Sequence, residues 1–448
     1  MATTVHIVGA GLAGLSAAVR LAEAGRQVAV YDAAKIAGGR CRSYLDTALG
    51  ITIDNGNHLL LSGNWAALDF LARIGSPVGL SGPDAANFPF ADLATGRRWT
   101  LRLNNGRLPW WILDARRRVP GSRAWNYFAP IRILRAPSST TVGEAMVCAG
   151  PLYERLWRPV LLAALNTEPS EAAAGLAAQI LRETLVAGGH ACRPLIAMAG
   201  LSATFVEPAL RFLVSKGASF HFGWRLRAIG LAEDRPKELD FGNVRIAIGP
   251  QDAVVLAVPA WVAPDLIPGL QAPASSRAIV NAHFRVEPPP DVPPVLGIIH
   301  GLTEWHFAYP NRFSVTISNA DRLLDEPRRA LARAIWREVS ILTGLPYDLP
   351  PWQIVKERRA TFAATPIEAS KRPTARTRFR DLVLAGDWTA TGLPATIEGA
   401  VRSGYAAASA LSGASAAKQL QAEAAKQGFG LAHGQHPLRS PRSTVRSP

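Results

Sequence analysis

A glycine-rich turn near the start of the chain carries the clearest chemical signal in the sequence. Residues 9–14 read Gly-Ala-Gly-Leu-Ala-Gly, directly after an apolar run and at the start of a segment with helical periodicity, and Asp32 ends the next apolar run. The first glycine permits a tight turn, the second lets the backbone approach a diphosphate, and the third lets helix and strand pack closely. The free N–H groups of the helix would face the phosphates, and Asp32 would accept hydrogen bonds from a ribose. The residues expected to line this dinucleotide site are Gly9, Gly11, Leu12, Ala13, Gly14 and Asp32.

Two further segments indicate that the dinucleotide is FAD rather than NAD. Gly-Gly-Arg at residues 38–40 suits a second close approach to the diphosphate, with the guanidinium as a charge neutraliser. Near the other end of the chain, Ala-Gly-Asp at residues 385–387 follows an apolar run and precedes a helix, so that its carboxylate could hold ribityl hydroxyls while the helix N-terminus faces the flavin. Taken alone, such an aspartate could also be an ordinary acid at the start of a helix. The contacts expected here are Gly38, Gly39, Arg40, Gly386, Asp387, Ala395, Thr396 and Ile397.

The elements that must position these residues alternate between strand and helix patterns. Strand-like runs at 5–8 and 27–31 flank a helical segment at 12–24, which makes one β-α-β unit of the length that a Rossmann half requires. The other expected elements are helices at 142–185 (interrupted at Pro159 and at the polar segment 166–170), 328–342 and 396–411, and strands at 219–229, 244–258, 278–286, 295–299, 313–318 and 382–385. Residues 80–135 are rich in Trp, Arg and Pro and show no clean period.

This alternation, over 448 residues, predicts an α/β fold of two joined domains: a Rossmann-like FAD-binding domain, discontinuous in sequence, with an inserted α+β substrate domain. The FAD-binding domain is expected from residues 1–80, 201–262 and 376–412. The substrate part is expected from a mostly helical, membrane-facing region at 81–200 and from a sheet-and-helix region at 263–375. The composition at 413–448 turns Ala/Gln/Lys-rich and then Pro/Ser/Arg-rich, which predicts a disordered basic tail.

Composition narrows the classes of protein that the chain can belong to. Cys41, Cys148 and Cys192 are too few and too scattered for a disulfide framework or a zinc site, so a reducing compartment and no metal are expected. The start of the chain lacks a signal peptide pattern, and no stretch reaches the ~20 apolar residues of a membrane span. We therefore expect a cytoplasmic protein, with at most peripheral contact to the cytoplasmic face of the inner membrane. The formal net charge of +15 fits anionic lipid or coding bias; no nucleic-acid-binding motif accompanies it, so no nucleic acid partner is expected.

The three cofactor segments together resemble those of the flavin amine oxidase and phytoene desaturase superfamily, whose members hold one FAD with all three. Further segments resemble a narrower family, the hydroxysqualene dehydroxylases, which are FAD-dependent enzymes of bacterial hopanoid synthesis. They are Asp-Asn-Gly-Asn-His at 54–58, Leu-Trp-Arg-Pro at 156–159 leading into Ala-Ala-Leu-Asn-Thr at 163–167, Arg-Ala-Thr-Phe-Ala-Ala-Thr-Pro at 359–366, and the run from Leu384 to Ala400. The resemblance extends from about Val5 to Leu411, and it departs at Asp32, where many superfamily members have Glu.

This resemblance implies removal of an allylic hydroxyl from a C30 polyprenyl alcohol, which leaves squalene. The hydroxyl must leave as water, the allylic cation must be sheltered from solvent, and reduced flavin must supply two electrons. A long-chain isoprenoid substrate and an unidentified flavin reductant are therefore the expected partners. His58 and Asp54 are the candidates for the proton donor, although a lone loop histidine is often structural and Asp-Asn-Gly is also a plain turn. Weaker alternatives are Glu398, as an acid or a helix cap, and Lys356, Arg358 and Arg359, as pocket-lining or solvated residues.

A hydrocarbon substrate held in a bilayer requires an apolar entrance near lipid. Trp110 and Trp111, with Arg107 before them and three arginines at 116–118 after them, combine interfacial aromatic residues with basic ones. We expect peripheral contact with an anionic membrane at this segment. The alternative is a partly buried Trp pair beside a charged loop.

Other functions stay open on the same scaffold. Phytoene-type desaturation or amine oxidation would run the flavin from oxidised to reduced, opposite to the dehydroxylation. A non-enzymatic prenyl-binding protein of related fold needs no diphosphate site, so the intact glycine and acidic motifs argue against it. A two-dinucleotide disulfide reductase is disfavoured because the sequence has no second glycine fingerprint and no paired redox cysteines.

Overall fold

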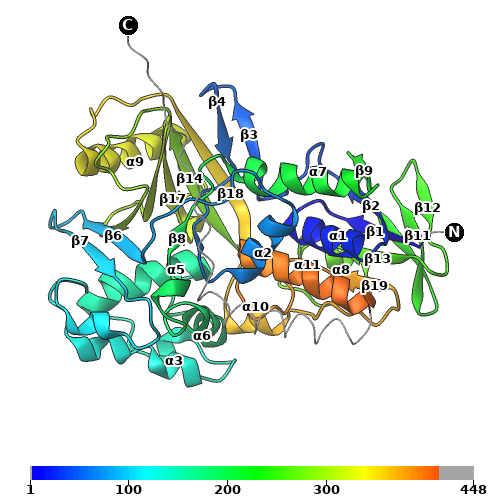
Figure 1. Cartoon of the computed structure of the whole chain (residues 1–448), viewed down its shortest axis with the longest axis horizontal. Coiled ribbons are helices and arrows are strands. Elements are labelled where there is room, and N and C mark those ends of the chain that lie inside the picture. The colour runs from blue at the N-terminus through cyan, green and yellow to red at the C-terminus, as the bar shows by residue number, and fades with distance from the viewer. Residues whose placement is uncertain (1–2, 413–448) are drawn as a thin grey trace, which may run out of the picture.

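The computed structural model describes residues 3–412, and the basic tail expected at 413–448 lies outside the described residues. A five-stranded parallel sheet forms the frame on the side of the glycine turn (Figure 1). Its strands lie in the order β19 (Leu382–Leu384), β13 (Ala253–Leu256), β1 (Thr4–Val8), β2 (Gln27–Asp32) and β9 (Ser219–Phe222). Apart from His6, the buried residues of the central strands β1 and β13 are apolar on both faces, as parallel strands covered on both sides require. The predicted α/β class, with its discontinuous Rossmann-like domain, is confirmed.

Each face of this sheet is covered by a different layer. Val28 and Val30 of β2 belong to a core with the helices α1 (Leu12–Glu23), α2 (Trp65–Arg73), α7 (Glu207–Ser215) and α11 (Ile397–Ser412). Tyr31, which points to the opposite face because side chains alternate along a strand, stacks 4.8 Å from Phe241 between ring centroids. Phe241 lies between β11 (Arg235–Asp240) and β12 (Arg245–Ala247), which form an antiparallel meander with β10 (Ala228–Ala232).

A seven-stranded mixed sheet makes up the other half of the molecule. Its order is β18 (Trp352–Phe362), β14 (Ser276–Phe284), β17 (Arg312–Ile317), β16 (Trp305–Tyr309), β15 (Val295–Ile299), β6 (Asn87–Asp92) and β7 (Arg98–Arg102). The helix α9 (Arg328–Thr343) packs on one face against the apolar residues of β14 and β17, such as Val280 and Val315. The alternate positions, Asn281, His283 and Thr316, are polar and buried, so the opposite face of the sheet is a polar one.

A helical region lies below this sheet in Figure 1 and joins it to the cofactor side. Its elements are η1 (Trp110–Leu113), η2 (Ala124–Phe128), α3 (Ile131–Arg135), α4 (Val142–Ala145), η3 (Tyr153–Trp157), α5 (Arg158–Leu165), α6 (Ala174–Glu183) and η4 (Gly189–Ala191). The short helix η5 (Ser202–Val206) leads into α7 and packs in the same core as α1. The remaining elements are β3 (Ser43–Asp46), β4 (Ile51–Asp54), β5 (Leu60–Leu61), β8 (Pro194–Leu195), α8 (Ala263–Leu266), η6 (Ala320–Leu323) and α10 (Pro366–Ser370). Within residues 3–412, no helix is long and apolar enough to cross a membrane.

Several expected elements are divided in the structure. The strand expected at 219–229 is two strands, β9 and β10, because the chain turns at Gly223, whose φ is +81°. The helical stretch expected at 142–185 is four helical pieces. Asn166 ends one of them with a left-handed φ of 47°, where the polar segment 166–170 predicts an interruption. Residues 80–135, which show no clean period, contain β6 and β7, and these strands join the edge of the seven-stranded sheet.

Candidate functional site

The turn between β1 and α1 has the shape that the glycine pattern predicts. Gly9 adopts φ +114°, and a Cβ atom there would lie 2.3 Å from the carbonyl oxygen of Ala257. A Cβ atom on Gly14 would lie 1.9 Å from the carbonyl oxygen of Gly9. A Cβ atom on Gly11, in contrast, would meet no described atom within 4 Å. Two of the glycines are therefore needed for packing, while Gly11 leaves open space at the start of the helix.

The N-terminus of α1 faces this open space without a capping side chain. Gly11 is the N-cap residue, and neither a side-chain cap nor an acidic residue lies in the first helical turn. The first N–H groups of a helix, here those of Leu12, Ala13 and Gly14, have no partner within the helix. Together with the positive end of the helix dipole, they make a site that fits the diphosphate of a dinucleotide.

The Gly-Gly-Arg segment lies directly against this turn. The N–H of Gly38 donates to the carbonyl of Ala10 at 2.8 Å, and a Cβ atom on Gly39 would lie 3.3 Å from Cα of Gly11. The Asp32 carboxylate accepts hydrogen bonds from the N–H of Ala10 and of Ala34, both at 2.7 Å, so it ties the end of β2 to the turn. The structure thus brings all three of these predicted features together.

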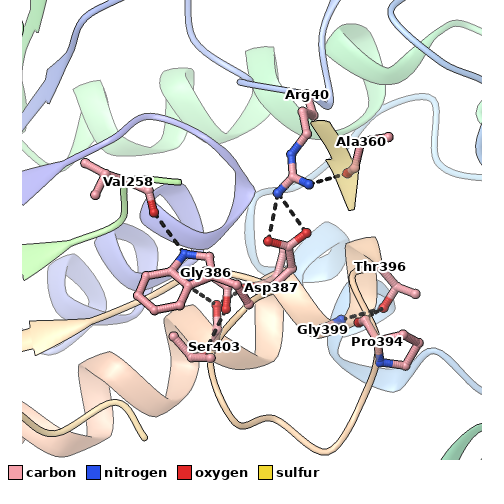
Figure 2. A network of polar contacts seen from close by, with 12 residues as sticks. Arg40, Val258, Ala360, Gly386, Asp387, Pro394, Thr396, Gly399 and Ser403 are labelled. Atoms are coloured by element: carbon pink, nitrogen blue, oxygen red, sulfur yellow. Dashed lines mark hydrogen bonds and ion pairs between the residues drawn. The ribbon is translucent and has the colours of Figure 1, made fainter. Parts of the chain in front are cut away.

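An ion pair joins the Gly-Gly-Arg segment to the far end of the chain (Figure 2). The guanidinium of Arg40 donates to both carboxylate oxygens of Asp387 at 2.7 Å, and it also donates to the carbonyl of Ala360. The Arg40 side chain is 40% exposed, whereas that of Asp387 is 9% exposed. Arg40 and Asp387, predicted from separate motifs, therefore meet in one place that is still partly open to solvent.

The loop that carries Asp387 is held from three sides. The N–H of Gly386 donates to Oγ of Ser403 at 2.8 Å, and Nε1 of Trp388 donates to the carbonyl of Val258 at 2.9 Å (Figure 2). The buried guanidinium of Arg372 donates to the carbonyls of Asp387, Trp388 and Thr389. Burial lowers the pKa of Arg372 to about 10, which leaves it cationic at neutral pH. Sequence reasoning missed Arg372, because it stands in no motif.

The helix α11 begins beside this loop, at the predicted contacts. The helix starts at Ile397, and the side chain of Thr396 accepts a hydrogen bond from the N–H of Gly399 at 3.0 Å (Figure 2). The neighbouring Glu398 is buried and accepts hydrogen bonds from the N–H groups of Ala66 and Ala67, at the start of α2. Glu398 therefore acts as a cap for another helix, which is the structural alternative that the sequence left open.

Asp54 is an anchor inside the protein. Its carboxylate accepts hydrogen bonds from Oγ of Ser43 at 2.6 Å and from the N–H of Leu201 at 2.8 Å, and it pairs with Arg312 at 2.8 Å. The Asp54 side chain is 2% exposed. Both carboxylate oxygens of Asp54 are engaged. This geometry favours a structural role, in which Asp54 ties the end of β4 to the start of η5, over proton donation.

His58 lies in the loop that follows β4 and has no hydrogen bond to its ring among the contacts of residues 3–412. Burial, with a smaller effect from nearby Arg40, lowers its pKa to about 4 against the opposing charge of Asp54. The imidazole is therefore neutral at pH 7. A neutral imidazole can donate a hydrogen bond but holds no extra proton to deliver.

The loop that carries His58 is hydrogen-bonded to the polar face of the seven-stranded sheet. Nδ2 of Asn57 donates to Oγ1 of Thr316 at 3.1 Å and to the carbonyl of Val315 at 3.3 Å. The side chain of Asn281 accepts from the N–H of Asn57 at 3.3 Å and from Thr316 at 2.8 Å. This network fixes the loop against the seven-stranded sheet.

The Asn-Thr segment at 166–167 also proves to be a structural tie. Asn166 donates to Oγ1 of Thr361 at 3.0 Å and accepts from the N–H of Asn319 at 2.7 Å. Thr167 accepts from the N–H of Ala364 at 2.9 Å. These bonds connect the end of α5 to the end of β18, which carries the Ala360 carbonyl that Arg40 contacts.

Two cavities open near these elements. One lies beside the ion pair and is lined by Arg40, Asp387, Trp261, Phe362 and Trp388. The other is lined by Arg158, Leu162, Ile298, Glu304 and Arg322. No cluster of metal-ligating side chains occurs in residues 3–412.

Glu304 in the second cavity is a titratable group that sequence reasoning missed. Burial raises its pKa to about 7, although the N–H of Ser318, at 2.8 Å, and the positive charge of Arg158 favour the ionised form. A carboxyl group that is half protonated near neutral pH is suited to proton transfer. Its position on the turn before β16 gave no signal in the sequence.

The two tryptophans predicted at a membrane contact point in different directions. Trp110 is 63% exposed, whereas Trp111 is 6% exposed and packs 5.0 Å from Tyr127 between ring centroids. Arg359, left open as a pocket or surface residue, lies over the ring of Trp261, which lines the first cavity.

Known proteins resemble this chain in sequence and in structure. Residues 12–412 match the family described as flavin containing amine oxidoreductase. Hydroxysqualene dehydroxylases of Rhodopseudomonas palustris and Sinorhizobium fredii are each 55% identical to it, over 91% of this chain and 98% of theirs. That of Zymomonas mobilis is 45% identical, with the same coverage.

Solved structures share the fold at low identity. An oxidoreductase from Methanosarcina mazei has a TM-score of 0.67 at 14% identity and covers 90% of this chain and 99% of its own. Cyclohexylamine oxidase from Brevibacterium oxydans has a TM-score of 0.64 at 16% identity and covers 94% of this chain and 100% of its own. Because the sequence relatives match along nearly their whole length, the chain belongs to the flavin-containing amine oxidoreductases and, within them, to the hydroxysqualene dehydroxylases.

Proposed function

We propose that this chain is an FAD-dependent enzyme that removes the allylic hydroxyl of hydroxysqualene and leaves squalene. The observation that carries the proposal is the meeting of the three cofactor segments at one place, in a chain 55% identical to two hydroxysqualene dehydroxylases. The overall change converts R–OH, two electrons and two protons to R–H and water. Each turnover therefore consumes two electrons from an external reductant, a partner still to be identified.

The residues around the glycine turn fit FAD. The open space over Gly11 and the uncapped start of α1 suit the diphosphate, and Asp32 lies at the strand end where a ribose would bind. Arg40 and Asp387 offer a positive charge and a carboxylate for the diphosphate and the ribityl chain. When bound in its reduced form, FAD would supply the two electrons.

Of the buried groups, Glu304 is better suited than His58 to deliver a proton to the leaving hydroxyl. The pKa of His58, about 4, leaves roughly one imidazole in a thousand protonated at pH 7. The pKa of Glu304, about 7, leaves a large share of its carboxyl groups protonated. The cavity that Glu304 lines has apolar walls at Leu162 and Ile298 and charged groups at Arg158 and Arg322, so Glu304 would act there among other polar groups.

The assay that tests the proposal supplies hydroxysqualene in detergent to the purified protein under anaerobic conditions, with dithionite as the reductant. We expect squalene, identified by mass, and FAD as the flavin released on denaturation. A parallel reaction is started with oxidised flavin and no dithionite; a product with two fewer hydrogens, together with reduction of the flavin, would there support a desaturase. A colourless protein that binds no FAD would support a prenyl carrier.

Two variants separate the candidate proton donors in the same assay. Glu304→Gln should lower the rate by about 10²-fold or more and leave the flavin content full, since the amide keeps the shape and loses the proton. His58→Ala should keep most of the turnover. The reverse ranking of the two variants would reassign the proton donor to His58.

We also propose that the protein works in the cytoplasm. Cys41, Cys148 and Cys192 are all unpaired, which suits a reducing compartment. Recovery of the active protein in the periplasmic fraction of its host would contradict this location.

A further inference from the structure

Two short 3₁₀ helices in the helical region place large apolar side chains on the outside of the molecule. η1 exposes Trp110 (63%) and Leu113 (64%), and η2 exposes Trp125 (63%) and Phe128 (51%). In a 3₁₀ helix, side chains three residues apart lie on the same face. Each helix therefore presents one Trp with one further apolar side chain on a single outward face.

The opposite faces of the same helices are firmly packed. Trp111 of η1 and Tyr127 of η2 make an edge-to-face contact, and Tyr127 makes another with Trp157, at 6.4 Å between ring centroids. The hydroxyl of Tyr127 accepts a hydrogen bond from the N–H of Val119 at 2.8 Å. Because the inner faces hold η1 and η2 together, the outer side chains are presented by a fixed scaffold.

The charges around these helices have one sign. Residues 102–135 contain eight arginines, one aspartate, and no lysine or glutamate. The aspartate, Asp114, is already paired with Arg116 at 3.2 Å. Arg107, Arg123 and Arg132 are exposed on the segments that carry the apolar residues. Any partner of this surface must therefore be both apolar and negatively charged.

We infer that this surface docks on an anionic lipid bilayer, with its apolar side chains in the interfacial region and its arginines at the headgroups. The interfacial surface consists of Leu108, Trp110, Leu113, Trp125, Phe128 and Ile131. Tryptophan beside arginine is the combination that the bilayer interface favours. A second copy of the chain would bring the same positive charge to the contact, so charge repulsion opposes self-association there. The inference does not depend on which reaction the enzyme catalyses.

The test measures co-sedimentation of the full chain with vesicles, in the absence of substrate. With vesicles that contain phosphatidylglycerol, we expect binding at low salt that weakens at 0.5 M salt, and much weaker binding to pure phosphatidylcholine. The variant Trp110→Ser/Leu113→Ser/Trp125→Ser/Phe128→Ser should lower the partition coefficient by about tenfold or more. Its flavin content and its activity on detergent-solubilised substrate should match the parent, which shows that it folds.

A matched control removes exposed apolar residues elsewhere. Val214→Ser/Tyr347→Ser/Ile367→Ser changes side chains that are 62%, 69% and 70% exposed, and it should bind vesicles like the parent. Equal binding by the quadruple variant and the parent would overturn the inference, as would an equal loss in the control variant. A dimer that the quadruple variant converts to a monomer, with no vesicle binding by either, would overturn it in favour of a second copy.

Discussion

Arg372 shows how one buried side chain can hold the loop of a binding site. It lies fifteen residues before Asp387 in the sequence, and its guanidinium donates to three consecutive backbone carbonyls and to Oγ1 of Thr391. Its only cation–π contact in the described chain is with Phe362, at 4.8 Å. A cation paired with carbonyl dipoles instead of a carboxylate leaves the charge of Asp387 free to interact with Arg40 or a ligand.

Replacing Arg372 with Met should therefore loosen the Asp387 loop. Loss of the donors leaves buried carbonyls unpaired, which should cost about 2–4 kcal/mol of unfolding free energy. We also expect less bound flavin per protein, measured by absorbance after gel filtration. Arg378→Met serves as the control, because Arg378 lies over Phe379 at the surface and holds no carbonyl of this loop. Equal flavin retention by the two variants would contradict the role of Arg372.

Glu304 predicts a pH dependence of stability. Because its pKa rises from 4.5 when unfolded to about 7 when folded, the folded state binds the proton more tightly, and stability falls as the pH rises through this window. Glu304→Gln removes that penalty, so it should be more stable than the parent at pH 8, by up to about 3 kcal/mol, and similar at pH 4. Urea unfolding at both pH values measures the difference.

The surface residue Glu207 provides the comparison: Glu207→Gln removes an exposed carboxyl group, and its urea unfolding is measured at the same two pH values. If the unfolding free energies of Glu304→Gln and the parent changed with pH in the same way, Glu304 would be ionised in the folded protein at neutral pH. This result would rule out Glu304 as the proton donor.

Among the elements, the unit of β1, its glycine turn and α1 contains glycines with two different roles. Gly14 is needed for packing, whereas Gly11 leaves space for the ligand. Gly14→Ala would place a Cβ atom 1.9 Å from the carbonyl of Gly9, so it should destabilise the apoprotein by several kcal/mol, about the cost of overpacking a core. Gly11→Ala meets no described atom within 4 Å and has an extended φ of −75° that alanine can adopt. It should leave apoprotein stability unchanged and weaken FAD binding at least about tenfold, because its methyl group occupies the diphosphate space.

Thermal unfolding of the two apoproteins and fluorescence titration with FAD distinguish these effects. If Gly11→Ala bound FAD as tightly as the parent, the diphosphate would not lie over this turn.

A feature could be predicted from the sequence when the residues that determine its geometry lie close together along the chain. The glycine turn, Asp32 and the Gly-Gly-Arg segment could be predicted because local spacing sets their geometry. The strands β6 and β7 could not, because neither has a periodic pattern and because β6 pairs with β15, about two hundred residues away, while β7 pairs with β6. The roles of Arg372, Glu398 and Glu304 depend on partners that fold against them. Trp110 and Trp111 differ only because Tyr127 packs against one of them.

At the scale of the whole molecule, the site closes only when the two ends of the chain meet. β1 pairs with β13, β13 pairs with β19, and the Arg40–Asp387 ion pair spans 347 residues. A cofactor bound at this junction would hold both ends together, so it should stabilise the native state by mass action. With free FAD at 1,000 times its Kd, we expect about 4 kcal/mol of added stability, measured by urea unfolding of apoprotein with and without FAD. Unchanged unfolding at saturating FAD would mean that the cofactor does not bridge the junction.

An anaerobic titration distinguishes reduction of the substrate by this enzyme from its oxidation. The FAD-loaded protein is reduced with one equivalent of dithionite, hydroxysqualene is added, and absorbance near 450 nm and squalene are measured together. We predict that oxidised-flavin absorbance returns without oxygen, with one squalene formed for each flavin oxidised. Flavin that stays reduced until oxygen is admitted, with no squalene formed, would contradict the account.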